Sequence, residues 1–178
     1  MQDTESTLFT KQAIAARVAQ LGAQISADYN GGDLVCVGVL KGSFIFMADL
    51  VRELNLPVTV DFIEASSYGT STQSSGMVTI TKDLRHSIAG RDVLIVEDII
   101  DTGVTLSYLV NYFKSQAPHS VRICTLVDKP ARRRIALSPD YCGFTIPDAF
   151  VVGYGLDYAE RYRNLPDICV LKPEVYSE

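Results

Sequence analysis

Apolar residues recur along this chain with two patterns, one typical of helices and one of buried strands. The helical period places Ile14, Val18, Leu21 and Ile25 on one face, whereas the predicted strands are short, largely apolar runs. Strand and helix signals alternate, which favours a parallel α/β sheet flanked by helices. The helices are expected from Thr10 to about Ala27, from Phe44 to Leu54 and from Thr105 onward; the strands are expected at 33–40, 58–62, 93–97, about 120–127, 149–154 and 168–171.

The second predicted helix and the late strands have specific expected places in the fold. The core-facing residues of that helix are expected to be Phe44, Met47, Leu50, Val51 and Leu54. The last two strands are short and are expected to form a small hood beside the main sheet. No repeat or long linker divides the chain, so residues 1–178 are interpreted as a single domain.

Composition narrows the class of protein. A hydrophobic content of 47% in 178 residues suits one domain with a sizeable core. A net charge of −5 argues against broad binding to nucleic acids or membranes, and the run Arg132–Arg134 is interpreted as a solvated surface stripe. The polar N-terminus is not typical of a signal peptide. The chain is therefore expected to be cytoplasmic, and its four scattered cysteines, none in a C-x-x-C pair, are expected to be reduced.

The stretch from Val93 to Thr105 carries the most specific chemistry. Four apolar residues end at Glu97 and Asp98, and Asp101-Thr102-Gly103-Val104-Thr105 then leads into a helix. A helix N-terminus with free N–H groups binds anions, and neighbouring carboxylates can hold a cation or sugar hydroxyls. The combination predicts a site for a phosphorylated sugar and a divalent metal. An ordinary strand–loop–helix connection with solvated acids is the alternative.

Two further segments follow predicted strands. Leu40-Lys41-Gly42-Ser43 precedes a helix and could form a second anion loop at the carboxyl edge of the sheet, although a surface lysine explains it equally well when taken alone. The polar segment 66–76 has no hydrophobic period and is a candidate lid.

A third group of residues suits a flat heterocyclic base. Lys129 ends an apolar strand, and an ammonium group only donates hydrogen bonds, which fits a carbonyl such as O6 of a purine. Phe150 could stack on such a ring, although an aromatic residue within A-F-V-V more often belongs to a core. Asp157 and Arg163 are ordinary surface charges without further context.

These segments together resemble a known family. L-K-G, S-Y-G, V-E-D-I-I-D-T-G, K-P and I-P-D-A-F-V-V-G-Y-G-L-D-Y have the order and approximate spacing of the type I phosphoribosyltransferases, most similar to the bacterial hypoxanthine-guanine branch. The resemblance implies the type I phosphoribosyltransferase fold and a homodimer or homotetramer. It also implies a Mg²⁺-dependent purine salvage reaction, in which phosphoribosyl pyrophosphate (PRPP) and hypoxanthine or guanine give IMP or GMP and pyrophosphate.

The resemblance also implies a role for each matching residue. Glu97 and Asp98 would bind the ribose hydroxyls directly or through Mg²⁺, and Asp101 would be the acid/base near purine N7. Other residues would bind the 5′-phosphate (Thr102, Gly103, Val104, Thr105), pyrophosphate (Leu40, Lys41, Gly42, Arg163) and the purine (Lys129, Phe150, Val151, Asp157). Asp157 would also help to hold a second Mg²⁺, Ser67 and Tyr68 would belong to the closing loop, and a cis peptide would join Leu40 to Lys41.

Three alternatives remain open. An RNA-binding regulator on the same fold is disfavoured by Asp101, where those proteins typically carry tyrosine, and by the acidic composition. A transferase for xanthine, uracil or orotate is disfavoured by the K-P and F-V-V-G-Y-G-L-D-Y segments. A non-catalytic nucleotide-binding module would leave three matching loops unexplained.

Overall fold

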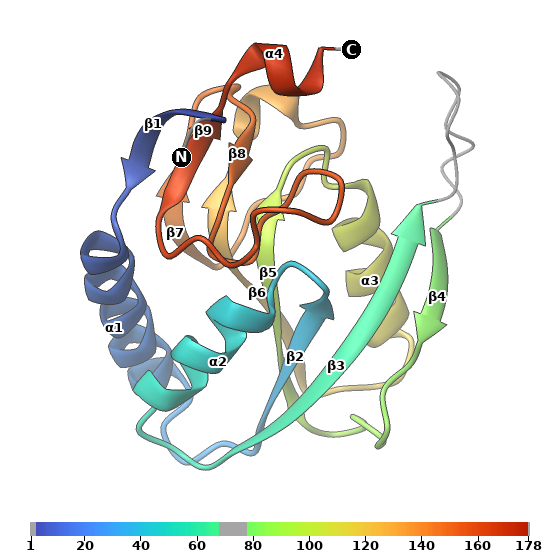
Figure 1. Cartoon of the computed structure of the whole chain (residues 1–178). Coiled ribbons are helices and arrows are strands. Elements are labelled where there is room, and N and C mark those ends of the chain that lie inside the picture. The colour runs from blue at the N-terminus through green and yellow to red at the C-terminus, as the bar shows by residue number, and fades with distance from the viewer. Residues whose placement is uncertain (1–2, 68–77, 178) are drawn as a thin grey trace.

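The computed structural model describes residues 3–67 and 78–177, which form a main sheet with helices on both faces and a smaller sheet at one end (Figure 1). Within these residues the main sheet has six strands in the order β4-β3-β2-β5-β6-β7. Its strands are β2 (Leu34–Leu40), β3 (Val58–Ser67), β4 (Val78–Lys82), β5 (Asp92–Ile100), β6 (Ser120–Asp128) and β7 (Tyr141–Thr145).

The main sheet is parallel apart from one edge. Strands β3, β2, β5, β6 and β7 pair in parallel, and β4 pairs antiparallel to β3. The expectation of a parallel α/β sheet is therefore confirmed for its body, and the antiparallel β4 edge makes the whole sheet mixed. The apolar run Val93–Val96 is fully buried at the centre, as continuous apolar strands in covered sheets usually are.

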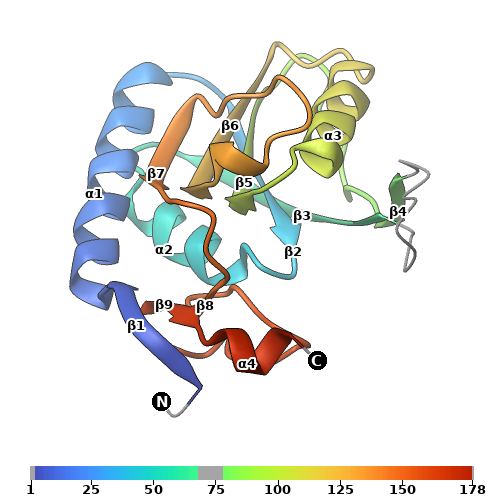
Figure 2. The same ribbon diagram turned by 90° about the horizontal axis from the view of Figure 1, so that it is seen from above.

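Helices α1 (Lys11–Asp28) and α2 (Phe44–Glu53) cover one face of the sheet, and α3 (Val104–Lys114) covers the other (Figure 2). The predicted α1 stripe is confirmed, because Ile14, Val18, Leu21 and Ile25 are all buried. Thr10 caps this helix by accepting a hydrogen bond from the Ala13 N–H.

The predicted inward face of α2 is partly wrong. Phe44 is 44% exposed, and Phe46 is buried instead, together with Met47 and Leu50. The sequence F-I-F-M is apolar around most of a helical turn, so its period does not specify which phenylalanine faces the sheet. In the structure the helix begins at Phe44 and buries Phe46, Met47 and Leu50.

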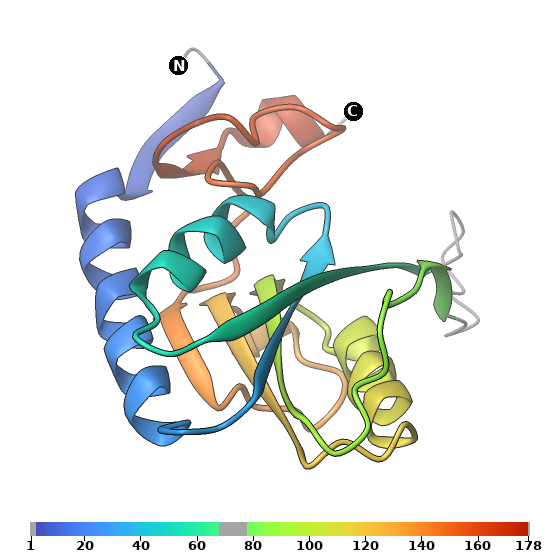
Figure 3. The same ribbon diagram turned by 90° about the horizontal axis from the view of Figure 1, so that it is seen from below.

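A second, three-stranded sheet forms the hood, in the order β1-β9-β8. It consists of β1 (Thr4–Phe9), β8 (Val151–Val152) and β9 (Ile168–Leu171), followed by the short helix α4 (Pro173–Tyr176). The strand predicted at 168–171 is confirmed, and the one predicted at 149–154 is reduced to Val151–Val152. Strand β1 was not predicted, because T-E-S-T-L-F has no clear alternation. Strands β2, β5 and β6 point towards the hood, so the loops that follow them gather beneath it (Figure 3).

The hood shares apolar contacts with the rest of the molecule. Val151, Leu156 and Ile168 belong to the same buried cluster as residues of α1 and of the main sheet. Among residues 3–67 and 78–177, no helix has both the length and the apolar character needed to cross a membrane.

Candidate active site

The two adjacent acids lie inside β5 and face opposite sides of it. The strand runs on to Ile100, so Glu97 and Asp98 lie within the strand and not at its end. Side chains alternate along a strand, and two different cavities result: Asp98 lines one and Glu97 lines the other. Each of the two acids therefore contributes its carboxyl group to a different cavity.

The environment of this pair disfavours two negative charges. Burial and repulsion from Asp98 raise the pKa of the Glu97 carboxyl well above its usual range, and burial raises the pKa of the Asp98 carboxyl. The Asp98 carboxylate accepts a hydrogen bond of 2.7 Å from the Ile99 N–H, which is too little to offset the burial. A bound cation would allow both groups to ionise.

The Glu97 cavity has a volume of about 120 Å³ and lies beside the turn between β5 and α3. Gly103 has a φ of +81°, a conformation that glycine adopts without strain, and α3 begins at the next residue. The walls of the Glu97 cavity combine acids, hydroxyls and the N-terminus of a helix: Glu97, Ile99, Ile100, Asp101, Thr102, Gly103, Thr105 and Leu106. This combination suits a phosphate attached to a sugar.

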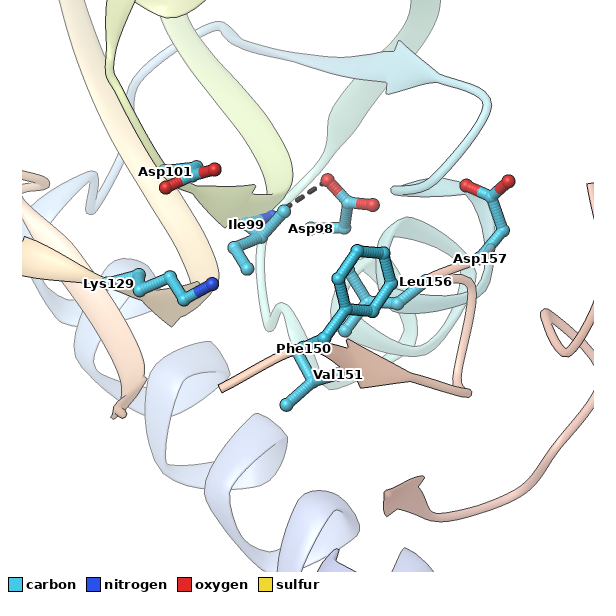
Figure 4. Close-up of a pocket in the computed structure, with 8 residues that line it drawn as sticks. All are labelled: Asp98, Ile99, Asp101, Lys129, Phe150, Val151, Leu156 and Asp157. Atoms are coloured by element: carbon cyan, nitrogen blue, oxygen red, sulfur yellow. Dashed lines mark hydrogen bonds between the residues drawn. The ribbon is translucent and has the colours of Figure 1, made fainter. Parts of the chain in front are cut away.

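The Asp98 cavity has a volume of about 190 Å³ and lies between the main sheet and the hood (Figure 4). Asp101 and Lys129 approach it from the sheet, and Phe150, Val151 and Asp157 approach it from the hood side. It thus offers a cation, acids and an aromatic face within one hollow, as a small flat ligand would require.

Lys129 and Phe150 are each held by neighbours. Lys129 is only 7% exposed, and its Nζ lies 3.1 Å from Asp148 Oδ1. The Phe150 ring stacks on Tyr176 of α4 at 4.8 Å between centroids and meets the edge of Tyr158 at 5.5 Å. These contacts position both side chains before any ligand binds.

The loop after β2 contacts both the acidic pair and the hood. The Leu40–Lys41 peptide is cis, as the resemblance implies. A Cβ atom placed on Gly42 would lie only 1.6 Å from Asp98 Oδ2, and one placed on Gly155 would lie 2.1 Å from the Gly42 carbonyl oxygen. Only glycines permit such close approach, so the segment from Leu40 to Gly42 is packed directly against Asp98 and the 153–156 turn.

Arg163 and Lys41 form ion pairs with acids of the hood. Arg163 donates to the Gly155 carbonyl at 2.8 Å and pairs with Asp157 at 3.0 Å, and Lys41 pairs with Glu160 at 3.0 Å. The Arg163 Nε is buried and has no hydrogen-bond partner within the described part of the chain. A phosphate oxygen would supply an acceptor for both cations.

The structure brings the predicted site residues that it describes to one end of the sheet, but not all of them line the two cavities. Leu40, Lys41, Gly42 and Arg163 lie beside these two cavities and line neither of them, and Val104 also lines neither. Ser67 ends β3, and Tyr68 lies outside the described residues.

Sequence reasoning missed three charged partners. Asp148 pairs with Lys129, Glu160 pairs with Lys41, and Arg132 Nε lies 3.3 Å from Asp101 Oδ1. Asp148 stands in the I-P-D motif and could have been suspected. Glu160 and Arg132 carry no sequence signal. Glu160 is far along the chain from its partner Lys41, and the position of Arg132 beside Asp101 depends on the turn Pro130–Arg132.

Together, the sheet, the hood and the loops at the carboxyl end define an enzyme of the type I phosphoribosyltransferase class. Residues 5–159 match the phosphoribosyl transferase domain family, and the chain belongs to that family.

Individual relatives are similar over nearly the whole chain. The hypoxanthine-guanine phosphoribosyltransferase of Bacillus subtilis is 53% identical over 174 residues, which cover 98% of this chain and 97% of that protein. The bifunctional protein TilS/HprT of Listeria innocua is 52% identical over 176 residues, 99% of this chain, and the chain spans only 27% of the length of that protein. A crystal structure of a hypoxanthine phosphoribosyltransferase from Staphylococcus aureus superposes with a TM-score of 0.96 at 50% identity, covering 99% of this chain and 96% of that one.

Proposed function

We propose that the chain transfers the 5-phosphoribosyl group of PRPP to N9 of hypoxanthine or guanine, giving IMP or GMP and pyrophosphate in a purine salvage reaction. The position of Asp101 carries this proposal, because Asp101 lines both cavities. A base in the Asp98 cavity and a ribose 5-phosphate in the Glu97 cavity would meet beside its carboxyl group. The Bacillus subtilis and Staphylococcus aureus relatives bear names of this activity, which supports the proposal.

Each side of the site would have a distinct task. Thr102, Gly103, Val104 and Thr105 would cradle the 5′-phosphate with backbone N–H groups and hydroxyls. Leu40, Lys41, Gly42 and Arg163 would receive pyrophosphate. Lys129 would donate to O6, Phe150 would stack on the purine, and Val151 and Asp157 would contact its edge. Adenine would be rejected, because its 6-amino group also donates and would face the donor Lys129.

The reaction needs a leaving group to be stabilised and a proton to be moved. The C1–O bond breaks with its electron pair going to pyrophosphate, the C1–N9 bond forms, and the purine loses one proton. Asp101 would accept or share that proton at N7 while N9 attacks. Asp101 Oδ1 lies 3.3 Å from Arg132 Nε but is buried without a hydrogen-bond partner within the described part of the chain, so it could accept a hydrogen bond from the base.

The acidic residues of the site suit Mg²⁺. Within residues 3–67 and 78–177, no three carboxylate, histidine or cysteine groups gather as a ready metal cluster. Mg²⁺ is commonly held by one or two carboxylates and by substrate oxygens, which fits Glu97, Asp98 and Asp157 beside a bound pyrophosphate. When bound, the ion would neutralise charge on the leaving group.

Two further expectations accompany this function. The free thiols of Cys36, Cys124, Cys142 and Cys169 suit a reducing compartment, so we expect the enzyme to work in the cytoplasm. We also expect a homodimer or homotetramer, which sedimentation at several protein concentrations would test.

A parallel assay tests the reaction. Turnover with PRPP and Mg²⁺ is measured against hypoxanthine, guanine, xanthine and adenine. We expect hypoxanthine and guanine to react and adenine to fail; comparable turnover of adenine would refute the role given to Lys129. No turnover of any base by the wild-type protein would refute the function itself.

A matched pair of variants tests the acid/base role. Asp101→Asn should retain binding of PRPP and lose turnover by at least about 100-fold. Asp33→Asn removes an exposed carboxylate that pairs with Arg91 near the start of β2, and it should keep normal turnover. Near-normal turnover of Asp101→Asn would contradict the assignment.

A further inference from the structure

The basic run Arg132–Arg134, which looked like a surface stripe in the sequence, lies behind the loop proposed to cradle the 5′-phosphate. The run begins at Arg132, the last residue of the short 3-10 turn Pro130–Arg132 that follows β6. The Arg134 N–H donates a 3.0 Å hydrogen bond to the Thr102 carbonyl oxygen. A Cβ atom placed on Gly103 would lie 3.2 Å from Arg133 Cδ and 3.7 Å from the Ile135 carbonyl oxygen. The segment 133–135 is thus packed against the back of residues 102–103.

This contact orients the peptide that joins Thr102 to Gly103. In a planar trans peptide the C=O and the N–H point to opposite sides. Because the Thr102 carbonyl accepts from the Arg134 N–H, the Gly103 N–H of the same peptide points away from Arg134, and both Thr102 and Gly103 line the Glu97 cavity. A backbone donor of the cradle is therefore aimed by a hydrogen bond on the opposite side of the loop.

The side chain of Arg133 fixes the supporting segment. It is only 13% exposed, and its Nη2 donates to the Asp128 carboxylate at the end of β6. Its Nη1 is buried without a hydrogen-bond partner within the described part of the chain, 3.7 Å from the Cβ position of Gly103. A buried guanidinium therefore joins β6 to the rear of the loop and adds positive charge close to the N-terminus of α3.

We propose that Arg133 is a positioning residue for the 5′-phosphate. Its pairing with Asp128 holds the 133–135 segment against the loop, so that the N–H groups of the cradle face the phosphate before it binds. This proposal rests on the proposed function, because it assumes that the Glu97 cavity takes the 5′-phosphate.

The test compares two ligands that differ only in that phosphate. Binding of IMP and of inosine is measured by calorimetry for the wild type and for Arg133→Gln, Arg133→Lys and Asp128→Asn. For Arg133→Gln we expect IMP to bind about tenfold more weakly and inosine to bind unchanged. Asp128→Asn breaks the same pair from its other side and should give the same selective loss, and Arg133→Lys should recover part of the affinity for IMP.

Kinetics and a charge control complete the test. In Arg133→Gln the KM for PRPP should rise about tenfold, while the KM for hypoxanthine and kcat at saturation should stay within about twofold. Arg134→Ala removes an exposed positive charge one residue away but keeps the backbone N–H, so its KM for PRPP should change by less than about twofold.

The outcomes separate this proposal from the function on which it rests. Equal weakening of IMP and inosine in Arg133→Gln, or unchanged binding of both in Arg133→Gln and Asp128→Asn, would overturn the positioning role. Wild-type protein that binds IMP no better than inosine would overturn the proposed use of the Glu97 cavity. If Arg133→Gln does not fold, Asp128→Asn and Arg133→Lys still decide between these results.

Discussion

Gly42 and Asp98 belong to different strand–loop units, and the close contact between them makes Gly42→Ala a sharp test of the site. The added Cβ would lie 1.6 Å from Asp98 Oδ2 and 2.5 Å from its Cγ. Non-bonded carbon and oxygen atoms approach to about 3.3 Å, so the carboxylate or the loop must move by roughly 1.7 Å. The φ of Gly42 lies outside the left-handed range, so alanine itself suits the backbone there.

The size of the effect follows from what that movement breaks. Moving the Asp98 carboxylate disrupts its 2.7 Å hydrogen bond from the Ile99 N–H, which should lower the free energy of unfolding by about 1–3 kcal/mol. A displacement of about 1 Å in a positioned reacting group commonly costs about 100-fold in rate. We therefore expect kcat/KM for PRPP to fall about 100-fold, equivalent to about 2.7 kcal/mol of transition-state stabilisation.

Gly90→Ala supplies a control that loses stability without touching the site. Gly90 has a φ of +72° and open space around its Cβ position, so alanine there should cost about 1–2 kcal/mol in backbone strain alone. The assay is steady-state turnover with PRPP varied at saturating hypoxanthine and Mg²⁺, alongside urea unfolding of each variant. Gly42→Ala with kcat/KM within about threefold of the wild type would refute the reasoning. So would an equal loss of kcat/KM in Gly90→Ala.

Three further predictions concern the charges of the site. Lys129→Ala should raise the KM for hypoxanthine at least about tenfold and leave the KM for PRPP nearly unchanged in steady-state kinetics. An equal rise of both KM values would contradict the proposed contact between Lys129 and the base. When a chelator removes divalent metal, Glu97 should contribute to the free energy of unfolding fully below its ordinary pKa of 4.5. This contribution should be lost as the pH rises through the raised pKa of Glu97 in the folded state. Urea unfolding should therefore show Glu97→Gln to be more stable than the wild type at pH 8, with a gap that narrows towards pH 4.5; a gap that does not change with pH would contradict this. Glu160→Gln releases Lys41 and Arg163, so the KM for PRPP should fall about twofold to fivefold at low salt and less in 0.5 M NaCl. A higher KM in that variant would mean that Glu160 assists binding.

The sequence predicts the centre of the fold better than its edges. Strand β5 and helix α3 were predictable because each buries a continuous or periodic apolar set, such as Val93–Val96 and Leu106 with Leu109. Strands β1 and β7 have no such set, and their extended form depends on the neighbouring strands β9 and β6. Pairing across the molecule decides such segments, and a local pattern does not contain that information.

The same distinction applies to the candidate site. The loops after β2, β5 and β6 could be placed together from sequence, because parallel strands bring their carboxyl ends to one edge of the sheet. The pairing of Glu160 with Lys41 could not be predicted, because the two residues are far apart in the chain and no motif marks Glu160. Glu160 itself has a φ of +63° within a turn where Ala159 and Tyr162 are also left-handed, which no spacing rule anticipates.

The ion pairs divide the site into a fixed side and an exchangeable side. Lys129 is buried, and its three donors would allow it to keep Asp148 while donating to a base oxygen, so the cavity proposed for the base is organised in advance. Lys41 and Glu160 are 58% and 66% exposed, and such pairs contribute little in water. A pyrophosphate group could therefore replace Glu160 on Lys41 and Arg163 at small cost. A neutral base would enter a prepared pocket, whereas the charged substrate would bind by exchanging one set of anionic partners for another.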